Sequence, residues 1–272
     1  LPFETNSYGR YGTTIVSQSE EQIIIKQLCL GPFDHFDVPE TVEYLCAGFF
    51  ENYTQEFTVF IHSNVQTLKE HVFYQLGCTK IEFEEGSKLA TLEDNALYRI
   101  ADLGSIKFPA KLSSWGKYNL SYCGCPKIEF EVNSNLKTLT SYAFWNIPNL
   151  KYLQLPDRLQ GFSGGTAVIK ACPLLEELWL PNTINSPIPQ NAIEECPLIS
   201  KIVLQSNFNV SANFGNLTNL TRETVIAMFR ALKDLTGSAS KTISLHKIVI
   251  DRLDAEDIEI ATSKNWSIGE IG

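Results

Sequence analysis

The chain has 272 residues, a net charge of −9 and a hydrophobic fraction of 44%, enough for one elongated domain or two compact ones. Only 19% of the residues are charged and 11% are aromatic, which excludes a disordered chain. Nucleic acid is not an expected partner, because phosphate binding requires clustered Lys and Arg, and no apolar run approaches the roughly 18 to 20 residues that span a bilayer.

The N-terminal residues 1–30 lie outside the repeat that occupies most of the chain. They open with Leu1 and Pro2 rather than Met, so we expect a processed chain in which a signal peptide or lipid anchor is not visible. A β-branched run at Ile23, Ile24 and Ile25 predicts a strand. We interpret residues 1–30 as an N-terminal cap, because the open end of a repeat array is an unpaired edge.

Residues 31–208 contain a repeat in which two apolar residues flank one variable residue. The first members of these pairs follow one another at steps of 23, 22, 25, 22, 25, 25 and 24 residues. A fixed period of this size predicts a solenoid of about eight coils, each burying its apolar side against its neighbours. The pairs are Phe36/Val38, Val59/Ile61, Ile81/Phe83, Ile106/Phe108, Ile128/Phe130, Leu153/Leu155, Leu178/Leu180 and Ile202/Leu204.

Each coil also has a predicted internal order. Alternation such as that from Lys80 to Glu84 predicts a short strand, and a proline such as Pro156 ends the strand by removing a donor. The return segment, for example from Leu92 to Leu97, is long enough only for a brief helix or a 3₁₀ turn. A second apolar column accompanies the first: Phe49, Phe73, Leu97, Leu120, Phe144, Ile169 and Ile193.

A third column contains small or polar residues near the end of each unit. We interpret it as one inward-facing turn position and expect its cysteines to be buried free thiols. Disulfide geometry between stacked in-register side chains would be poor. The column contains Cys78, Asp102, Cys125, Asn149, Cys172 and Cys196.

From residue 209 to residue 272 the repeat gives way to a predicted α/β C-terminal cap. Thr221 is a plausible N-cap, and apolar residues at helical spacing continue to Leu235, with Gly237 just beyond. A strand over 242–245, a helix from Asp254 and a short strand at Trp266 complete this region.

The unit from Leu136 to Pro156, LKTLTSYAFWNIPNLKYLQLP, resembles the BspA-type leucine-rich repeat, whose pattern is L-x-x-I-x-x-x-A-F-x-x-C/N-x-x-L-x-x-I-x-L-P. The segments starting at Leu220 and Asp257 resemble the ends of many gut-bacterial leucine-rich repeat proteins. The resemblance implies an α/β solenoid with a parallel sheet on its concave face and short return helices or 3₁₀ turns. It also implies an exported or surface-attached bacterial protein, in some cases an adhesin for host or matrix proteins. Trp115 and Gly116 depart from the pattern by replacing the leucine of one return segment.

No catalytic motif occurs in the chain, and we expect neither a catalytic residue, a metal nor a cofactor. Cys123-Gly124-Cys125 lacks a second Cys or His pair at ligand spacing. The preference of carboxylates for a helix N-terminus explains the acidic residues Asp254, Glu256, Asp257 and Glu259.

The informative surface is the outward face of the predicted sheet, since residues beside and between the inward pairs point away from the core. Aromatic residues there are not needed for folding, and an exposed Trp beside a Tyr is typical of a binding hot spot. An alternative is that neighbouring elements cover these rings. The predicted ligand-binding residues are Tyr152, Gln154, Glu177, Trp179, Lys201 and Phe60.

The sequence therefore predicts a non-catalytic binding module, outside the cell or on its surface, with an extracellular host or matrix protein as partner. Glycan binding through the aromatic rings is an alternative. A passive spacer within a larger surface protein is another, and an enzyme is the least expected reading.

Overall fold

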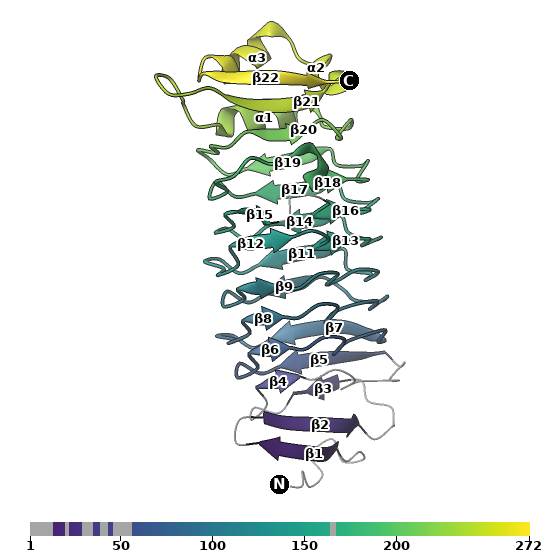
Figure 1. Ribbon diagram of the computed structural model, residues 1–272. Coiled ribbons are helices and arrows are strands. Elements are labelled where there is room, and N and C mark those ends of the chain that lie inside the picture. The colour runs from purple at the N-terminus through teal and green to yellow at the C-terminus, as the bar shows by residue number, and fades with distance from the viewer. Residues whose placement is uncertain (1–12, 20–21, 29–34, 39–42, 46–55, 164–166) are drawn as a thin grey trace.

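The computed structural model describes residues 13–19, 22–28, 35–38, 43–45, 56–163 and 167–272. Its coils stack in a column that runs from an N-terminal hairpin to a helical C-terminal end (Figure 1). The hairpin consists of the antiparallel strands β1 (Thr13–Ser19) and β2 (Gln22–Leu28), and β2 contains the predicted Ile23 strand. The predicted inward residue Phe49 lies outside the described residues.

Two parallel sheets form the face of the column that carries the predicted binding residues. One parallel sheet has the order β3-β5-β7 and a second has the order β19-β17-β14-β11-β9. Register pairs such as Ile106↔Ile128 and Leu153↔Leu178 align the predicted repeat pairs coil by coil. The strands are β3 (His35–Asp37), β5 (Phe57–Ile61), β7 (Cys78–Phe83), β9 (Ile106–Phe108), β11 (Lys127–Phe130), β14 (Tyr152–Gln154), β17 (Glu177–Leu180) and β19 (Lys201–Leu204).

The return segments consist mainly of turns and very short strands, where the sequence predicted brief helices or 3₁₀ turns. In the described repeats the 3₁₀ geometry is confined to η1 (Gln190–Ala192). Pairing with the next coil satisfies the backbone groups that a helix would otherwise pair internally. The short strands are β4 (Tyr44–Leu45), β6 (Thr67–Leu68), β8 (Thr91–Leu92), β10 (Ser114–Trp115), β12 (Thr138–Thr140), β13 (Phe144–Trp145), β15 (Gly161–Ser163), β16 (Ile169–Lys170) and β18 (Ile193–Glu194).

The core lies inside the coils, where the predicted apolar columns meet. From Val59 to Leu204 the inward pairs are buried, except that Phe83 is half-buried. The irregular residue Trp115 is also buried, and its ring packs against Phe108 and Phe144 with centroids 4.9 and 5.3 Å away. Its indole N–H donates to the carbonyl of Ala143 at 3.1 Å, so this departure from the repeat pattern fills the core rather than weakening it.

The single turn column predicted for the cysteines is wrong, because it merges two positions. Asp102 and Asn149 are exposed, and their neighbours Leu103 and Leu150 are buried instead. The repeat units vary in length from 22 to 25 residues. Residues at the same spacing in different units therefore need not point in the same direction. The thiols show the two positions: Cys78 and Cys125 donate to a carbonyl two residues ahead, whereas Cys172 and Cys196 donate to one two residues behind.

The C-terminal end is a parallel sheet flanked by helices. The predicted N-cap Thr221 is confirmed, since its hydroxyl accepts from the Thr224 N–H at 3.1 Å. The helix ends earlier than predicted, because Leu232 is extended and bridges Phe208. The elements are β20 (Ala212–Phe214), α1 (Arg222–Ala231), β21 (Lys241–His246), α2 (Lys247–Ile250), α3 (Ala255–Thr262) and β22 (Trp266–Ile271).

Candidate functional site

Five of the six predicted binding residues lie together on the outward face of three adjacent strands. Tyr152 and Gln154 come from β14, Glu177 and Trp179 from β17, and Lys201 from β19. The register pairs Tyr152 with Glu177, Gln154 with Trp179, and Glu177 with Lys201. We call these five residues the sheet-face patch. Their positions follow from strand alternation, because the residues between them along each strand are buried.

Contacts inside the sheet-face patch hold its rings in place. The rings of Tyr152 and Trp179 lie 6.4 Å apart between centroids and are tilted by 49°, within the range of favourable aromatic pairs. The Trp179 indole N–H donates to Glu177 Oε1 at 2.5 Å, and Lys201 Nζ lies 3.1 Å from the same oxygen. The Tyr152 hydroxyl donates to Gln154 Oε1 at 3.2 Å. Each ring is half-buried by its neighbours and keeps part of its surface exposed.

Lys127 and Glu129 border the sheet-face patch, and neither was among the predicted binding residues. Lys127 Nζ lies 4.9 Å from the centroid of the Tyr152 ring and 3.0 Å from Glu129 Oε2. Burial, followed by the charges of Glu129 and Glu177, raises the pKa of Tyr152, so its hydroxyl stays a hydrogen-bond donor to a higher pH than that of a free tyrosine. The repeat phase could have identified Lys127, which precedes Ile128 as Tyr152 precedes Leu153.

A shallow depression lies beside the sheet-face patch. It has a volume of about 400 Å³ and is lined by Lys107, Glu129, Phe130, Glu131, Val132 and Gln154. Val132 at its edge is 74% exposed. Because Gln154 belongs to both features, the depression extends the patch along the sheet towards β9.

The sixth predicted residue, Phe60, lies elsewhere. It belongs to β5, and strands β7, β9 and β11 lie between that strand and β14 (Figure 1). Its ring makes an edge contact with His62, with centroids 5.0 Å apart. Phe60 is therefore too many coils away to share one small ligand with Tyr152 and Trp179.

The described cysteines are buried in the core, where their thiols bond to backbone groups. Cys123 Sγ donates to the Leu97 carbonyl at 3.1 Å and accepts from the Ile100 N–H at 3.3 Å. Burial raises the pKa of Cys78 and of Cys125 to about 12, which disfavours the thiolate needed for redox chemistry or metal binding. The hydrogen bond that the Cys172 thiol donates to its neighbour Cys196, together with burial, raises the pKa of Cys172. All five described cysteines are buried and free, which confirms the prediction made for four of them and adds Cys123.

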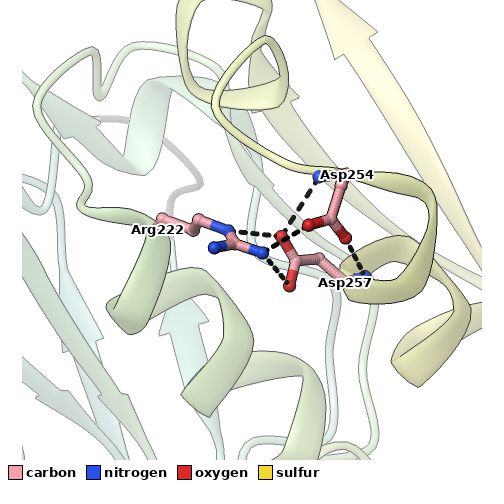
Figure 2. Close-up of polar contacts among 3 residues, drawn as sticks. All are labelled: Arg222, Asp254 and Asp257. Atoms are coloured by element: carbon pink, nitrogen blue, oxygen red, sulfur yellow. Dashed lines mark hydrogen bonds and ion pairs between the residues drawn. The ribbon is translucent and has the colours of Figure 1, made fainter.

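The acidic residues at the start of α3 form a structural joint. Figure 2 shows Arg222, the first residue of α1, reaching both carboxylates: Nε lies 2.6 Å from Asp257 Oδ2 and Nη2 lies 2.5 Å from Asp254 Oδ2. Asp254 and Asp257 also form a reciprocal capping box with each other's backbone N–H groups. The hydrogen bond with Arg222 lowers the pKa of Asp257. This arrangement links α1 to α3 and gives Asp254 and Asp257 a structural role.

The described part of the chain contains no group of three or more His, Cys, Asp or Glu residues placed to hold a metal ion. Among the same residues, no helix combines the length and the apolar character needed to cross a bilayer.

Comparison with known proteins places the repeat in a family. The family model described as BspA type leucine-rich repeat region matches six copies, over residues 29–133 and 91–221. No curated protein matches. The chain is similar to the solved pneumococcal vaccine antigen PcpA at 14% identity, covering 96% of each chain with a TM-score of 0.47.

A second similar structure is a leucine-rich cell surface protein from Faecalibacterium prausnitzii A2-165. The identity is 13%, the coverage is 100% of this chain and 95% of the other, and the TM-score is 0.27. Both TM-scores are below 0.5, so the assignment rests on the repeats alone. Those repeats span most of the chain and fold into stacked parallel coils, and the protein belongs to the family with BspA-type leucine-rich repeats.

Proposed function

We propose that this protein is a non-catalytic binding module that recognises an extracellular protein through the sheet-face patch. The observation that carries the proposal is the convergence of Tyr152 and Trp179 on one rigid sheet, each ring positioned by a hydrogen bond to a neighbouring side chain. Tyr and Trp at the centre of a contact, bordered by polar groups that set orientation, have the composition of a protein-binding hot spot.

The polar border supports a partner of mixed charge. Lys127 and Lys201 lie on either side of the rings, and Glu129 and Glu177 are paired with them at 3.0 and 3.1 Å. Such pairs at the rim contribute little affinity but set the orientation and the rate of docking. Because the sheet backbone is fixed by its neighbours on both sides, the rings lose little freedom on binding, which favours affinity.

We further propose that the protein acts outside the cell or on its surface. The support is the membership in the BspA-type repeat family, which the sequence resemblance associates with exported and surface-attached proteins. Brief protease treatment of intact source cells tests this point. We expect the protein to be cleaved before the cells lyse, and survival of the full-length protein until lysis would contradict a surface location.

The binding proposal is tested with a panel of purified extracellular-matrix proteins beside a glycan array. We expect saturable binding to at least one protein, weakened at least tenfold, or about 1.4 kcal/mol, by Tyr152→Ala and by Trp179→Ala. Phe60→Ala is the matched control, because it removes an aromatic ring from the same face at a distance of several strands. Binding to glycans alone, or equal weakening by all three substitutions, would overturn the proposal.

A further inference from the structure

A second group of aromatic residues lies along the return segments of the coils. Its rings are continuous over four coils: Tyr74 and Tyr98 stack at 5.6 Å with an interplanar angle of 5°, and Tyr98 meets Tyr122 edge-on at 5.6 Å. Tyr122 then meets Trp145 at 5.7 Å. Tyr118 and Tyr142 stack at 5.5 Å beside them. We call Tyr74, Tyr98, Arg99, Tyr118, Tyr122, Tyr142 and Trp145 the aromatic ridge.

The aromatic ridge is separate from the sheet-face patch. Trp145 lies on β13, which belongs to the sheet of β16 and β18, whereas the patch lies on the sheet of β14, β17 and β19 (Figure 1). Tyr74 is 38% exposed, and the other rings of the ridge are half-buried. A continuous row of partly exposed rings on the surface of a single chain is uncommon and marks an interaction surface.

Three tyrosines of the ridge have backbone conformations that tyrosine disfavours. Tyr118, Tyr122 and Tyr142 have φ values of 60°, 59° and 62°, in the left-handed region where a bulky side chain crowds the backbone. The corresponding turns of adjacent coils contain Asn95 and Asn146, with φ values of 58° and 54°, and asparagine tolerates this conformation better. Left-handed residues recur in the turns of the other described coils, so the conformation is a property of the repeat and not of the ridge alone.

Arg99 gives the ridge its charge. Its guanidinium carbon lies 5.5 Å from the centroid of the Tyr98 ring and 5.3 Å from that of the Tyr122 ring. Contacts with aromatic rings hold a guanidinium in place while its N–H groups remain free to form a fork. Within the described part of the chain Arg99 makes no ion pair, although the protein carries a net charge of −9. A positioned guanidinium fork suits a carboxylate, which can accept two parallel hydrogen bonds.

We propose that the aromatic ridge is a second recognition surface, which docks an acidic segment of a partner protein. A carboxylate of that segment binds the Arg99 guanidinium, and flanking apolar side chains pack on the edges of the Tyr and Trp rings. A glycan is less well suited, because Tyr74 and Tyr98 stack face to face and present edges and hydroxyls rather than open ring faces. The ridge would allow the protein to bind two partners, or two regions of one partner, at the same time.

The test uses a phage library of random linear peptides, selected on the wild-type protein and counter-selected on the Arg99→Gln/Tyr122→Asn double variant. We expect the peptides that depend on the ridge to contain Asp or Glu beside apolar residues. A synthetic peptide of this kind, followed by fluorescence anisotropy, should bind at least tenfold more weakly to Arg99→Gln and to Tyr122→Asn. Its affinity should fall as salt is raised, and replacing its acidic residue by the amide should abolish the difference between wild type and Arg99→Gln.

We expect both variants to preserve the fold, because asparagine fits the left-handed conformation at position 122 and Gln75 has the same conformation as Arg99 in the preceding coil. Lys111→Gln, which removes another exposed cation, is the matched control and should bind the peptide as wild type does. Tyr152→Ala should also bind it normally, which separates this surface from the sheet-face patch. The proposal is overturned if no selected peptide depends on the ridge, if such peptides lack acidic residues, or if a glycan or a second copy of the protein occupies the ridge instead.

Discussion

Neighbouring residues on the same strand have different roles in this protein. On β14, Leu153 points into the coil and is fully buried, and the preceding residue Tyr152 points outward and remains half-buried. The inward residues are aliphatic or aromatic in every coil, because each must fill the same space between its neighbours. The outward residues vary from coil to coil, including Glu82, Lys107, Gln154 and Trp179. The fold is therefore specified by the constant side of the strands, and the surface available for recognition is set by the variable side.

The largest expected effect comes from removing the C-terminal cap, which exposes inward residues at the end of the column. We propose that α1 caps the coil of β19, against which it packs. A chain ending at Gln205 would expose the inward residues Ile202 and Leu204 at an open end, so we expect aggregation or loss of cooperative unfolding. Size-exclusion chromatography and thermal unfolding provide the measurement. A monomeric product with the melting temperature of the full chain would show that the open end needs no cap.

The next effect compares the two sides of one strand directly. We expect Leu153→Ala to lower the free energy of unfolding by about 2 to 5 kcal/mol, because it leaves a cavity in a close-packed core. Tyr152→Ala should lower it by about 1 kcal/mol or less, since the ring is only partly buried and its contacts lie near solvent. Urea unfolding of both variants gives the two values. Equal losses would mean that the outward ring contributes to folding as much as the core does.

The cysteines test burial on the inward side without a substitution. We expect Cys78, Cys123, Cys125, Cys172 and Cys196 to resist a thiol reagent in the native protein and all seven cysteines to react in denaturant, because burial removes access. In all of these except Cys196, a raised pKa also disfavours the thiolate. Mass spectrometry of the labelled peptides identifies the protected sites. Rapid labelling of any of these five, or a Cys172–Cys196 disulfide in gently handled protein, would contradict the packing.

The smallest expected effect concerns the joint between α1 and α3. Asp257 has a lowered pKa in the folded protein, so its contribution to stability is present above the pKa of the unfolded carboxyl, about 3.9, and is lost as pH falls through the folded value. Asp257→Asn should lower the melting temperature at neutral pH and flatten its decline in acid. Thermal scans across acidic pH measure both. Identical profiles for the variant and wild type would show that Asp257 does not stabilise the joint between α1 and α3.

The sequence predicted the inward columns well because their spacing follows directly from the geometry of stacked strands. The predicted inward direction of Asp102 and Asn149 was wrong, because a repeat of variable length shifts the turn residues relative to the strands. Only the backbone shows that the following residues, Leu103 and Leu150, point inward instead. It predicted brief helices where pairing between coils favours short strands. The five residues of the sheet-face patch could be found from alternation alone, and Lys127 from the same phase.

The aromatic ridge was missed although its signal is present in the sequence. Tyr74, Tyr98, Tyr122 and Trp145 follow one another at steps of 24, 24 and 23 residues. The period-2 pattern of the sheet identifies inward and outward strand residues, whereas these residues lie in or beside turns or, for Trp145, on the two-residue strand β13. Left-handed turn residues have no simple alternation, so their direction could not be derived before the backbone was known. Aromatic residues that recur at the repeat period in the turns, as well as on the strands, are therefore a sequence signal for such a surface.

The most direct test of the account compares Leu178→Ala with Trp179→Ala, two neighbouring substitutions on β17. Both the free energy of unfolding and the affinity for the protein ligand are measured for each variant at a temperature where both are folded. We predict that Leu178→Ala lowers stability by about 2 to 5 kcal/mol and leaves affinity within about threefold, whereas Trp179→Ala lowers affinity at least tenfold with little change in stability. The reverse pattern, or a loss of both properties in both variants, would contradict the division between the side that folds and the side that recognises.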